Sequence, residues 1–382
     1  MEKFLSNLEP FKEIIFVTRP VLPKIEEVTE KLKDIWEAKW LTNNGPQHSM
    51  LESELENFLK VPYLSLFNNG TIALIVACQS LRLSGEVITT PFTFAATTHV
   101  LSWNNIQPIF CDIDAETMNL DAEKIESMIT PHTTAILPVH VFGTPCDVEK
   151  IQEVADKYGL KVIYDAAHAF GVEIGGEGIG NFGDISMFSF HATKLYHTVE
   201  GGALVHGDKN LKARIDLLKN FGIKNEDEVV MPGINGKLNE VSSAIGRIML
   251  NYVEDERQKR KLLHEIYDSE LSEVEGIKLM PKCGEDVKLN YQYYVIRIDE
   301  KLFGKSRDEV YDEFKKYNVY TRKYFHPLCS EFTCYRQLNS ARKENLPVAN
   351  KIADQVLSMP MYGELSADDV KKICDILKSM RR

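Results

Sequence analysis

Between about residues 63 and 167, short apolar runs alternate with longer segments in which apolar residues recur every three or four positions. The short runs, which predict buried strands, are residues 63–67, 86–94, 106–114, 133–143 and 161–167. The helix-like segments between them are residues 71–83, 95–105, 122–129 and 147–159. This alternation predicts βαβ units and a mostly parallel α/β sheet covered by helices. Ligands of such sheets collect at the carboxyl ends of the strands.

The pattern changes after about residue 237. Residues 237–271 read as one long helix, broken near Asn251. A strand (291–298), a helix (306–318), a second strand (319–325) and a terminal helix from Ser366 are expected to follow. We therefore predict a large domain over residues 1–255 and a small α+β domain over residues 256–382.

Composition and charge narrow the range of functions. The chain has 382 residues, 44% of them hydrophobic, and a net charge of −11, which argues against nucleic acid or an anionic membrane as a partner. No run reaches the roughly 18 apolar residues of a membrane helix, and the first residues do not resemble a signal peptide, so the cytoplasm is the expected location. The seven cysteines include no Cys-x-x-Cys pair, and no metal site is expected.

Two residues point to specific chemistry. Lys194 follows the strand-like run 184–190, and Asp165 ends the run 161–165. Most lysines are solvated surface groups, but the neighbours of Lys194 are largely apolar, and buried lysines without a role are rare. A lysine amine and a carboxylate at strand ends are the groups that pyridoxal phosphate requires: the amine forms a Schiff base with the aldehyde, and the acid keeps the pyridine nitrogen protonated.

Other candidates have ordinary alternative explanations. Asn68–Thr71 precede a helix, where free amides bind phosphate, but the same residues also suit a simple turn and helix cap. Phe94 and His168 are core residues by default; Phe94 could instead stack on a cofactor ring. Gly178–Gly183 match the dinucleotide-binding pattern G-x-G-x-x-G, but the next residues read as a strand, so a NAD-binding oxidoreductase is rejected.

Together these motifs resemble one family. Gly70-Thr71, PFTFAATTHVLSWNN (91–105), DAAHAFG (165–171), FSFHATK (188–194), EGG (200–202) and GINGKLNE (233–240) match, in order and spacing, the DegT/DnrJ/EryC/StrS sugar aminotransferases. The resemblance extends from about Thr42 to the last helix. It implies the fold type I (aspartate aminotransferase-like) architecture and pyridoxal 5'-phosphate as cofactor, with pyridoxamine 5'-phosphate as its intermediate form.

The resemblance also implies roles for single residues. Lys194 would be the Schiff-base lysine and Asp165 the partner of the ring nitrogen, while His168 stands where many members have glutamine, near the ring hydroxyl. Ser189 and the Gly70-Thr71 backbone would hold the phosphate. Asn235 would reach the phosphate in the neighbouring subunit, which implies a homodimer with shared sites. The departures are small: Ile72 stands where alanine is common, and Lys237 where arginine is common.

The expected reaction is amino transfer from an amino acid, L-glutamate by expectation, to a nucleotide-linked keto sugar. The chain is most similar to the branch that aminates C4 of dTDP-4-keto-6-deoxyglucose. The aromatic segment with Tyr324 and His326 would face the sugar, and Arg322 either meets the diphosphate or belongs to a solvated basic edge. The alternatives are amination at C3, a sugar dehydratase, in which histidine replaces the lysine, and a non-catalytic regulator.

Overall fold

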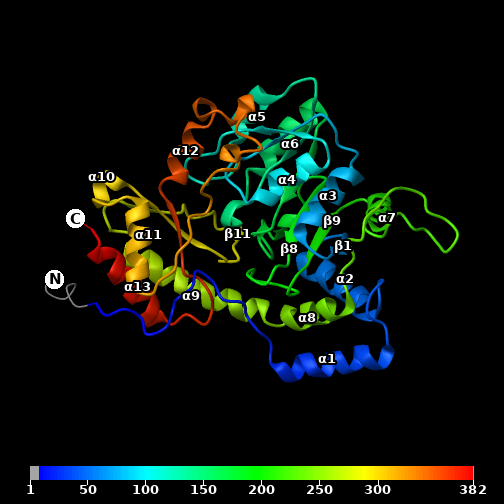
Figure 1. Cartoon of the computed structure of the whole chain (residues 1–382), viewed down its shortest axis with the longest axis horizontal. Helices are drawn as coiled ribbons and strands as arrows, with labels where there is room; N and C mark the ends of the chain where they lie inside the picture. Colours follow the sequence, from blue (N-terminus) through cyan, green and yellow to red (C-terminus); the bar gives the residue numbers. More distant parts are fainter. Residues whose placement is uncertain (1–7, 382) are drawn as a thin grey trace.

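The computed structural model describes residues 8–381, and a seven-stranded sheet lies at its centre (Figure 1). The strand order is β1-β9-β8-β5-β4-β2-β3. The pairs from β8 to β3 are parallel, whereas β9 runs antiparallel to both of its neighbours. The strands are β1 (Tyr63–Phe67), β2 (Glu86–Thr89), β3 (Gln107–Phe110), β4 (Thr133–Leu137), β5 (Lys161–Asp165), β8 (Ile185–Ser189) and β9 (Gly202–His206). The mostly parallel α/β sheet predicted from the sequence is confirmed.

Helices follow the strands as the alternation predicts. Apolar side chains of both kinds of element form the buried cores on the sheet's two faces. The helices of this part are α1 (Ile25–Ala38), α2 (Pro46–Leu59), α3 (Gly70–Ser80), α4 (Ala95–Trp103), α5 (Ala122–Ile125), α6 (Val148–Tyr158), α7 (Lys209–Leu218) and α8 (Glu240–Leu250). The glycine-rich segment Gly178–Gly183 leads into strand β8, without the helix that a dinucleotide site requires.

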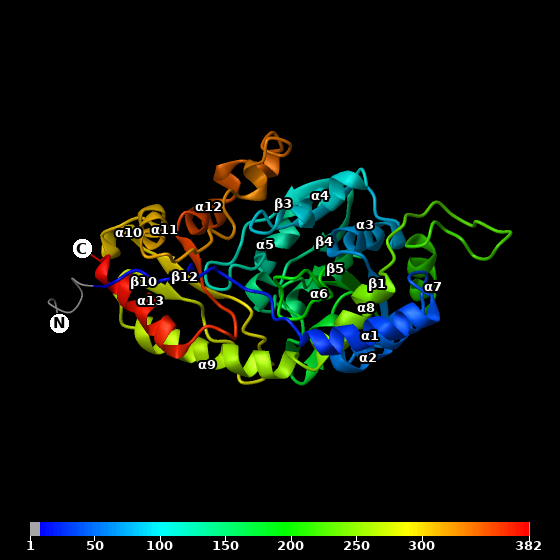
Figure 2. The ribbon, with the colours of Figure 1, turned by 60° about the horizontal axis from the view of Figure 1, so that its bottom comes forward.

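The long helix predicted for residues 237–271 is present and broken where expected. It consists of α8 and α9 (Val253–Leu271), which Figure 1 shows end to end along one side of the molecule. The break follows Leu250, where Asn251 caps α8. Beyond α9, a second sheet of order β10-β12-β13 is antiparallel and is covered by helices, among them α9 and α13 (Figure 2).

The remaining elements belong mainly to this second layer. They are β10 (Ile277–Leu279), β11 (Val287–Lys288), β12 (Tyr294–Ile298), α10 (Glu300–Phe303), α11 (Arg307–Lys316), α12 (Pro347–Ala353), β13 (Val356–Met359) and α13 (Ala367–Ser379). The short strands β6 (Glu173–Ile174) and β7 (Glu177–Gly178) pair with β11 in a third sheet. Helix α13 begins with a capping box at Ser366, as its predicted start requires.

The predicted strand 319–325 is wrong. Only two isolated bridges form there, Ile15 with Val319 and Arg322 with Ser358. The alternating apolar pattern is satisfied locally, because Val319 is buried under the N-terminal segment. The chain then turns towards the first sheet, where Phe325 packs in a core with residues of that layer. The segment therefore does not run beside a single neighbouring strand for long enough to form a β-ladder.

The N-terminal segment packs on the C-terminal layer. Phe11 and Ile15 join the core formed by α9, α11, α13 and the second sheet, and the amide of Phe11 donates to the carbonyl of Tyr317. Both described chain ends accordingly lie at the same end of the molecule (Figure 1). Within residues 8–381, no helix is long and apolar enough to cross a membrane.

Candidate active site

A cavity of about 320 Å³ lies where the carboxyl ends of the parallel strands meet. The end of β5 contributes Asp165, the end of β8 contributes Ser189, and the turn after β1 leads into Gly70. The predicted residues that line this cavity are Gly70, Thr71, Phe94, Asp165, His168, Ser189, Lys194 and Tyr324. The topology therefore brings together groups spread over more than two hundred positions of the chain.

Lys194 lies in the loop between β8 and β9 and is half-buried. Its Nζ atom donates a hydrogen bond to the hydroxyl of Tyr293 at 3.1 Å, and it lies 5.6 Å from the centre of that ring. Within residues 8–381, no carboxylate forms an ion pair with this amine. An amine that is free of a carboxylate partner can bond to an aldehyde and can also exchange protons.

Asp165 is a buried acid with a prepared hydrogen-bond environment. Its side chain is almost fully buried, one oxygen accepts from the hydroxyl of Thr97 at 2.7 Å, and the other accepts from the amide of Ala167 at 3.0 Å. Burial raises the pKa of Asp165, an effect that these hydrogen bonds and the charge of Lys194 partly offset. A cation next to this carboxylate would offset the free energy that burial of its negative charge costs.

His168 is oriented as a hydrogen-bond donor towards the cavity. Its Nδ1 atom accepts from the amide of Phe142 at 3.2 Å, so the proton of a neutral ring must be on Nε2. Burial, and secondarily the charge of Lys194, lowers the pKa of His168 well below its ordinary value. The imidazole is therefore neutral at physiological pH and offers one N–H to an acceptor in the cavity.

The part of the cavity beside Gly70 and Ser189 is suited to a phosphate. Helix α3 begins at Gly70, and the first amides of a helix have no acceptor within it and favour an anion. Close packing fixes this helix end: a Cβ atom at Gly202 would lie 2.7 Å from the Gly70 nitrogen. Ser189 adds a hydroxyl beside it. The helix end and the hydroxyl together form an anion cradle.

Three predicted residues lie outside the lining of this cavity. Asn235 is exposed and accepts a hydrogen bond from Lys237 at 2.9 Å. Arg322 is exposed, and the exposed ring of His326 is 4.0 Å from Asp354. Of the predicted substrate residues, Tyr324 alone lines the cavity.

Three residues that shape the site were not predicted from the sequence. Tyr293 contacts Lys194, and the hydroxyl of Thr97 links Asp165 to the hydroxyl of Thr93 at 2.8 Å. Thr93 and Thr97 fall within the motif PFTFAATTH, four residues apart, so their spacing could have placed them on one side of a helix start. Tyr293 belongs to the run YQYYVIRI, which reads simply as a strand.

The residues present fit pyridoxal 5'-phosphate. The cavity combines an amine and a buried acid, neither of which forms an ion pair within residues 8–381, with a neutral imidazole donor and an anion cradle. These groups match the aldehyde, ring nitrogen, ring hydroxyl and phosphate of that molecule. Phe94 is 63% exposed although it borders the cavity, so its ring remains available to cover a flat ligand.

Comparison with known proteins agrees with this chemistry. The sequence model of the DegT/DnrJ/EryC1/StrS aminotransferase family matches residues 23–378. Two proteins named dTDP-4-amino-4,6-dideoxy-D-glucose transaminase are similar over nearly their whole length. The Escherichia coli protein is 48% identical, with 94% of this chain and 97% of that protein covered, and the Shigella dysenteriae protein is 45% identical, with 96% and 99% covered.

A solved structure is similar as well. The crystal structure of DesI, determined in the presence of its TDP-sugar product, superposes with a TM-score of 0.92 at 34% identity and covers 98% of this chain and 95% of that one. The fold type I architecture expected from the sequence is therefore confirmed.

Proposed function

Because this chain belongs to the DegT/DnrJ/EryC1/StrS aminotransferase family, it is a pyridoxal phosphate-dependent enzyme, and we propose that it aminates the C4 ketone of dTDP-4-keto-6-deoxyglucose with L-glutamate as donor. One observation carries the proposal: a free amine and a buried acid share a cavity in a chain whose relatives are named for this product. Lys194 also argues against the dehydratase branch, in which histidine replaces the lysine.

Bound pyridoxal phosphate supplies an aldehyde that bonds to amines and a ring that takes up electrons. In our proposal, Nζ of Lys194 accepts the proton that leaves the α-carbon of the amino donor. The same Nζ would pass this proton to the cofactor carbon that carried the aldehyde. In the second half-reaction it would remove a proton from that carbon and deliver one to C4 of the sugar. A single flexible amine can transfer protons in both directions, and Lys194 is the lysine that lines the cavity.

The other residues bind and orient. With the cofactor bound, the carboxylate of Asp165 would stabilise positive charge at the ring nitrogen, and Nε2–H of His168 would donate to the ring hydroxyl. The amides of Gly70 and Thr71 and the hydroxyl of Ser189 would hold the phosphate, and Phe94 would stack on the ring. Tyr324 faces the sugar from the same cavity, and we place the diphosphate outside it, near Arg322 and His326.

The position of amination has a direct test. The purified enzyme is run in reverse with 2-oxoglutarate and either a 4-amino or a 3-amino dTDP-6-deoxyhexose, and glutamate is measured. We expect glutamate from the 4-amino sugar only. Glutamate from the 3-amino sugar alone would establish amination at C3 instead, and glutamate from neither sugar would refute the proposed pairing of a dTDP-linked acceptor with glutamate as donor.

We further propose that the enzyme is a homodimer whose sites are shared. The segment after α7 extends away from the body in both views (Figures 1 and 2) and leads back to Asn235. It exposes the apolar side chains of Phe221, Ile223, Val229 and Val230, and Phe94 is exposed at the cavity. Exposed apolar residues on a projecting segment suit a second copy of the chain.

Sharing is testable by subunit mixing. Lys194→Ala should be inactive, and Asn235→Ala should bind pyridoxal phosphate about tenfold more weakly, because a hydrogen bond to a charged group is lost. If Asn235 reaches the partner's site, mixing and reassociating the two variants restores some fully equipped sites and therefore activity at low cofactor concentration. A monomer by sedimentation with full activity, or mixtures no more active than their components, would exclude the shared site.

A further inference from the structure

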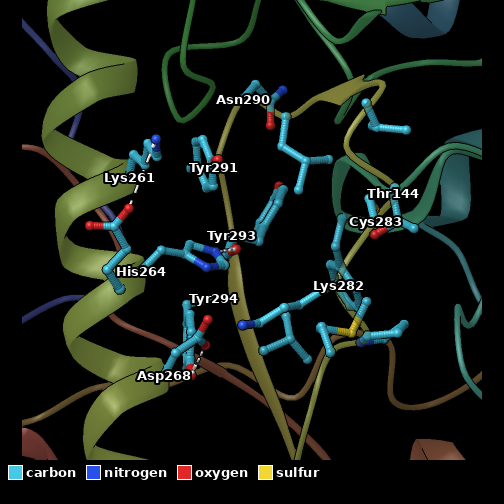
Figure 3. Close-up of a pocket in the computed structure, with 18 of the residues that line it drawn as sticks. Thr144, Lys261, His264, Asp268, Lys282, Cys283, Asn290, Tyr291, Tyr293 and Tyr294 are labelled. Atoms are coloured by element: carbon cyan, nitrogen blue, oxygen red, sulfur yellow. Dashed lines mark hydrogen bonds and ion pairs between the residues drawn. The ribbon is translucent and has the colours of Figure 1, made fainter. Parts of the chain in front are cut away.

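Tyr293 lies between the seven-stranded sheet and the second sheet, at the reaction centre. It directly precedes β12 of the second sheet, but its side chain lines the same cavity as Lys194. It also borders a neighbouring cavity of about 350 Å³, on the side of α9 (Figure 3). Figure 3 shows Tyr291, Tyr293 and Tyr294 along one extended segment that faces His264 of α9.

The hydroxyl of Tyr293 is directed at the amine of Lys194. The 3.1 Å bond between them is the one hydrogen bond that either group makes within the described part of the chain. The acceptor is a neutral oxygen rather than a carboxylate, so the amine is held in place by a hydrogen bond and not by an ion pair.

Side-chain hydrogen bonds of Asn290 and Gln292 fix the main chain just before Tyr293. The side-chain amide of Asn290 donates to the carbonyls of His168 and Phe170, at 2.8 and 3.1 Å. The Gln292 side chain accepts from the amide of Leu195, the neighbour of Lys194, at 3.1 Å.

His264 holds the main chain at Tyr293 itself. Its Nε2 atom donates to the Tyr293 carbonyl at 2.9 Å, a contact drawn as a dashed line in Figure 3. The Tyr293 ring itself packs 4.7 Å from the ring of His168 and 5.6 Å from that of Phe142. Hydrogen bonds to the main chain and ring contacts therefore set the position of the hydroxyl independently of Lys194.

We propose that Tyr293 is a catalytic residue whose hydroxyl holds the amine of Lys194 whenever that amine is not bonded to the cofactor. The inference rests on the proposed role of Lys194. A lysine side chain is long and flexible, and an amine that must attack an aldehyde and later transfer protons works best when it is held near the reacting atoms. The bond to Tyr293 forms and breaks without any covalent change in the tyrosine.

Cofactor capture by the apoenzyme tests this role apart from turnover. Apoenzyme is mixed with pyridoxal 5'-phosphate, the visible absorbance is followed, and the product is trapped with borohydride and mapped. Binding of pyridoxamine 5'-phosphate, which has no aldehyde for Lys194 to attack, is measured in parallel. Tyr293→Phe should capture the aldehyde about tenfold more slowly, on the scale of one lost hydrogen bond, and bind pyridoxamine phosphate as the parent does.

Tyr291→Phe is the matched control, because Tyr291 lines the neighbouring cavity and is absent from the lining of the cofactor cavity. It should capture the cofactor at the parent's rate. Equal capture by Tyr293→Phe and the parent would overturn the inference, as would a parallel loss of pyridoxamine phosphate affinity, which would indicate a purely structural role. Capture on another lysine in the parent would instead refute the role of Lys194, and this inference with it.

Discussion

Lys194→Ala is expected to abolish transamination while the protein remains folded. The amine makes one hydrogen bond and no ion pair within the described residues, so its removal breaks no structural network. Turnover should fall by about 10⁴-fold or more, because covalent attachment and proton transfer are lost together. The measurements are turnover, the circular dichroism spectrum, and mass after borohydride reduction with pyridoxal 5'-phosphate.

Two further variants make this result specific. Lys194→Arg keeps a positive charge in the cavity but cannot bond to the aldehyde, so it should be as inactive as the alanine variant. Lys150→Ala removes a half-buried surface lysine that pairs with the exposed Glu123 and lies outside the cavity, and it should behave as the parent. If reduction of the parent attaches the cofactor to any lysine other than 194, the assignment is wrong.

The sequence was most informative where neighbouring residues determine structure. Lys194 and Asp165 each follow an apolar run, and runs of this kind became β8 and β5, whose carboxyl ends meet at one edge. The break in the long helix at Asn251 was also predictable from neighbouring residues alone. Contacts between segments far apart in the sequence were not predictable in this way. Tyr293 is an example, since it precedes a strand of the second sheet and contacts Lys194 ninety-nine positions away.

The wrong strand at 319–325 has a related cause. Apolar alternation shows that Val319 is buried, but it does not show what covers it, and here the cover is the N-terminal segment, more than three hundred residues away. Arg322 and His326 illustrate the same limit. Their proximity to the aromatic Tyr324 in the sequence suggested one pocket, although the chain turns so that Tyr324 faces inward and the other two are exposed.

Asp165→Asn is expected to retain the cofactor and to react slowly. The amide can replace the carboxylate in the local network, because the Thr97 hydroxyl can turn to accept from the new Nδ2 group and donate to Thr93. Only the charge is lost. Since that charge stabilises the protonated ring nitrogen, the activation free energy of proton abstraction should rise by more than ~3 kcal/mol, which slows this step by more than about a hundredfold. Single-turnover absorbance after addition of L-glutamate measures the step.

Asp112→Asn is the matched control, because Asp112 is also buried but accepts from the amides of Val348 and Ala349 and does not line the cavity. It should keep the parent's turnover even if it melts earlier. Near-parental proton abstraction by Asp165→Asn would disprove the electrostatic role.

The pH dependence of folding stability gives an independent measure of the Asp165 charge. Burial determines whether that charge stabilises or destabilises the folded protein. The pKa of Asp165 is raised in the folded protein, so between its ordinary and raised values the folded apoenzyme binds more protons than the unfolded chain. Its contribution to stability is therefore greatest at low pH and declines as the pH rises through that window. Asparagine does not titrate, so the apo form of Asp165→Asn should melt at or above the parent's Tm, by a margin that grows as the pH rises above the ordinary pKa of an aspartate. Pyridoxal phosphate should then stabilise the parent more than the variant, because only the parent gains a cation beside a buried carboxylate. If the margin does not grow with pH and the cofactor stabilises both proteins equally, the buried charge carries no cost for the cofactor to offset.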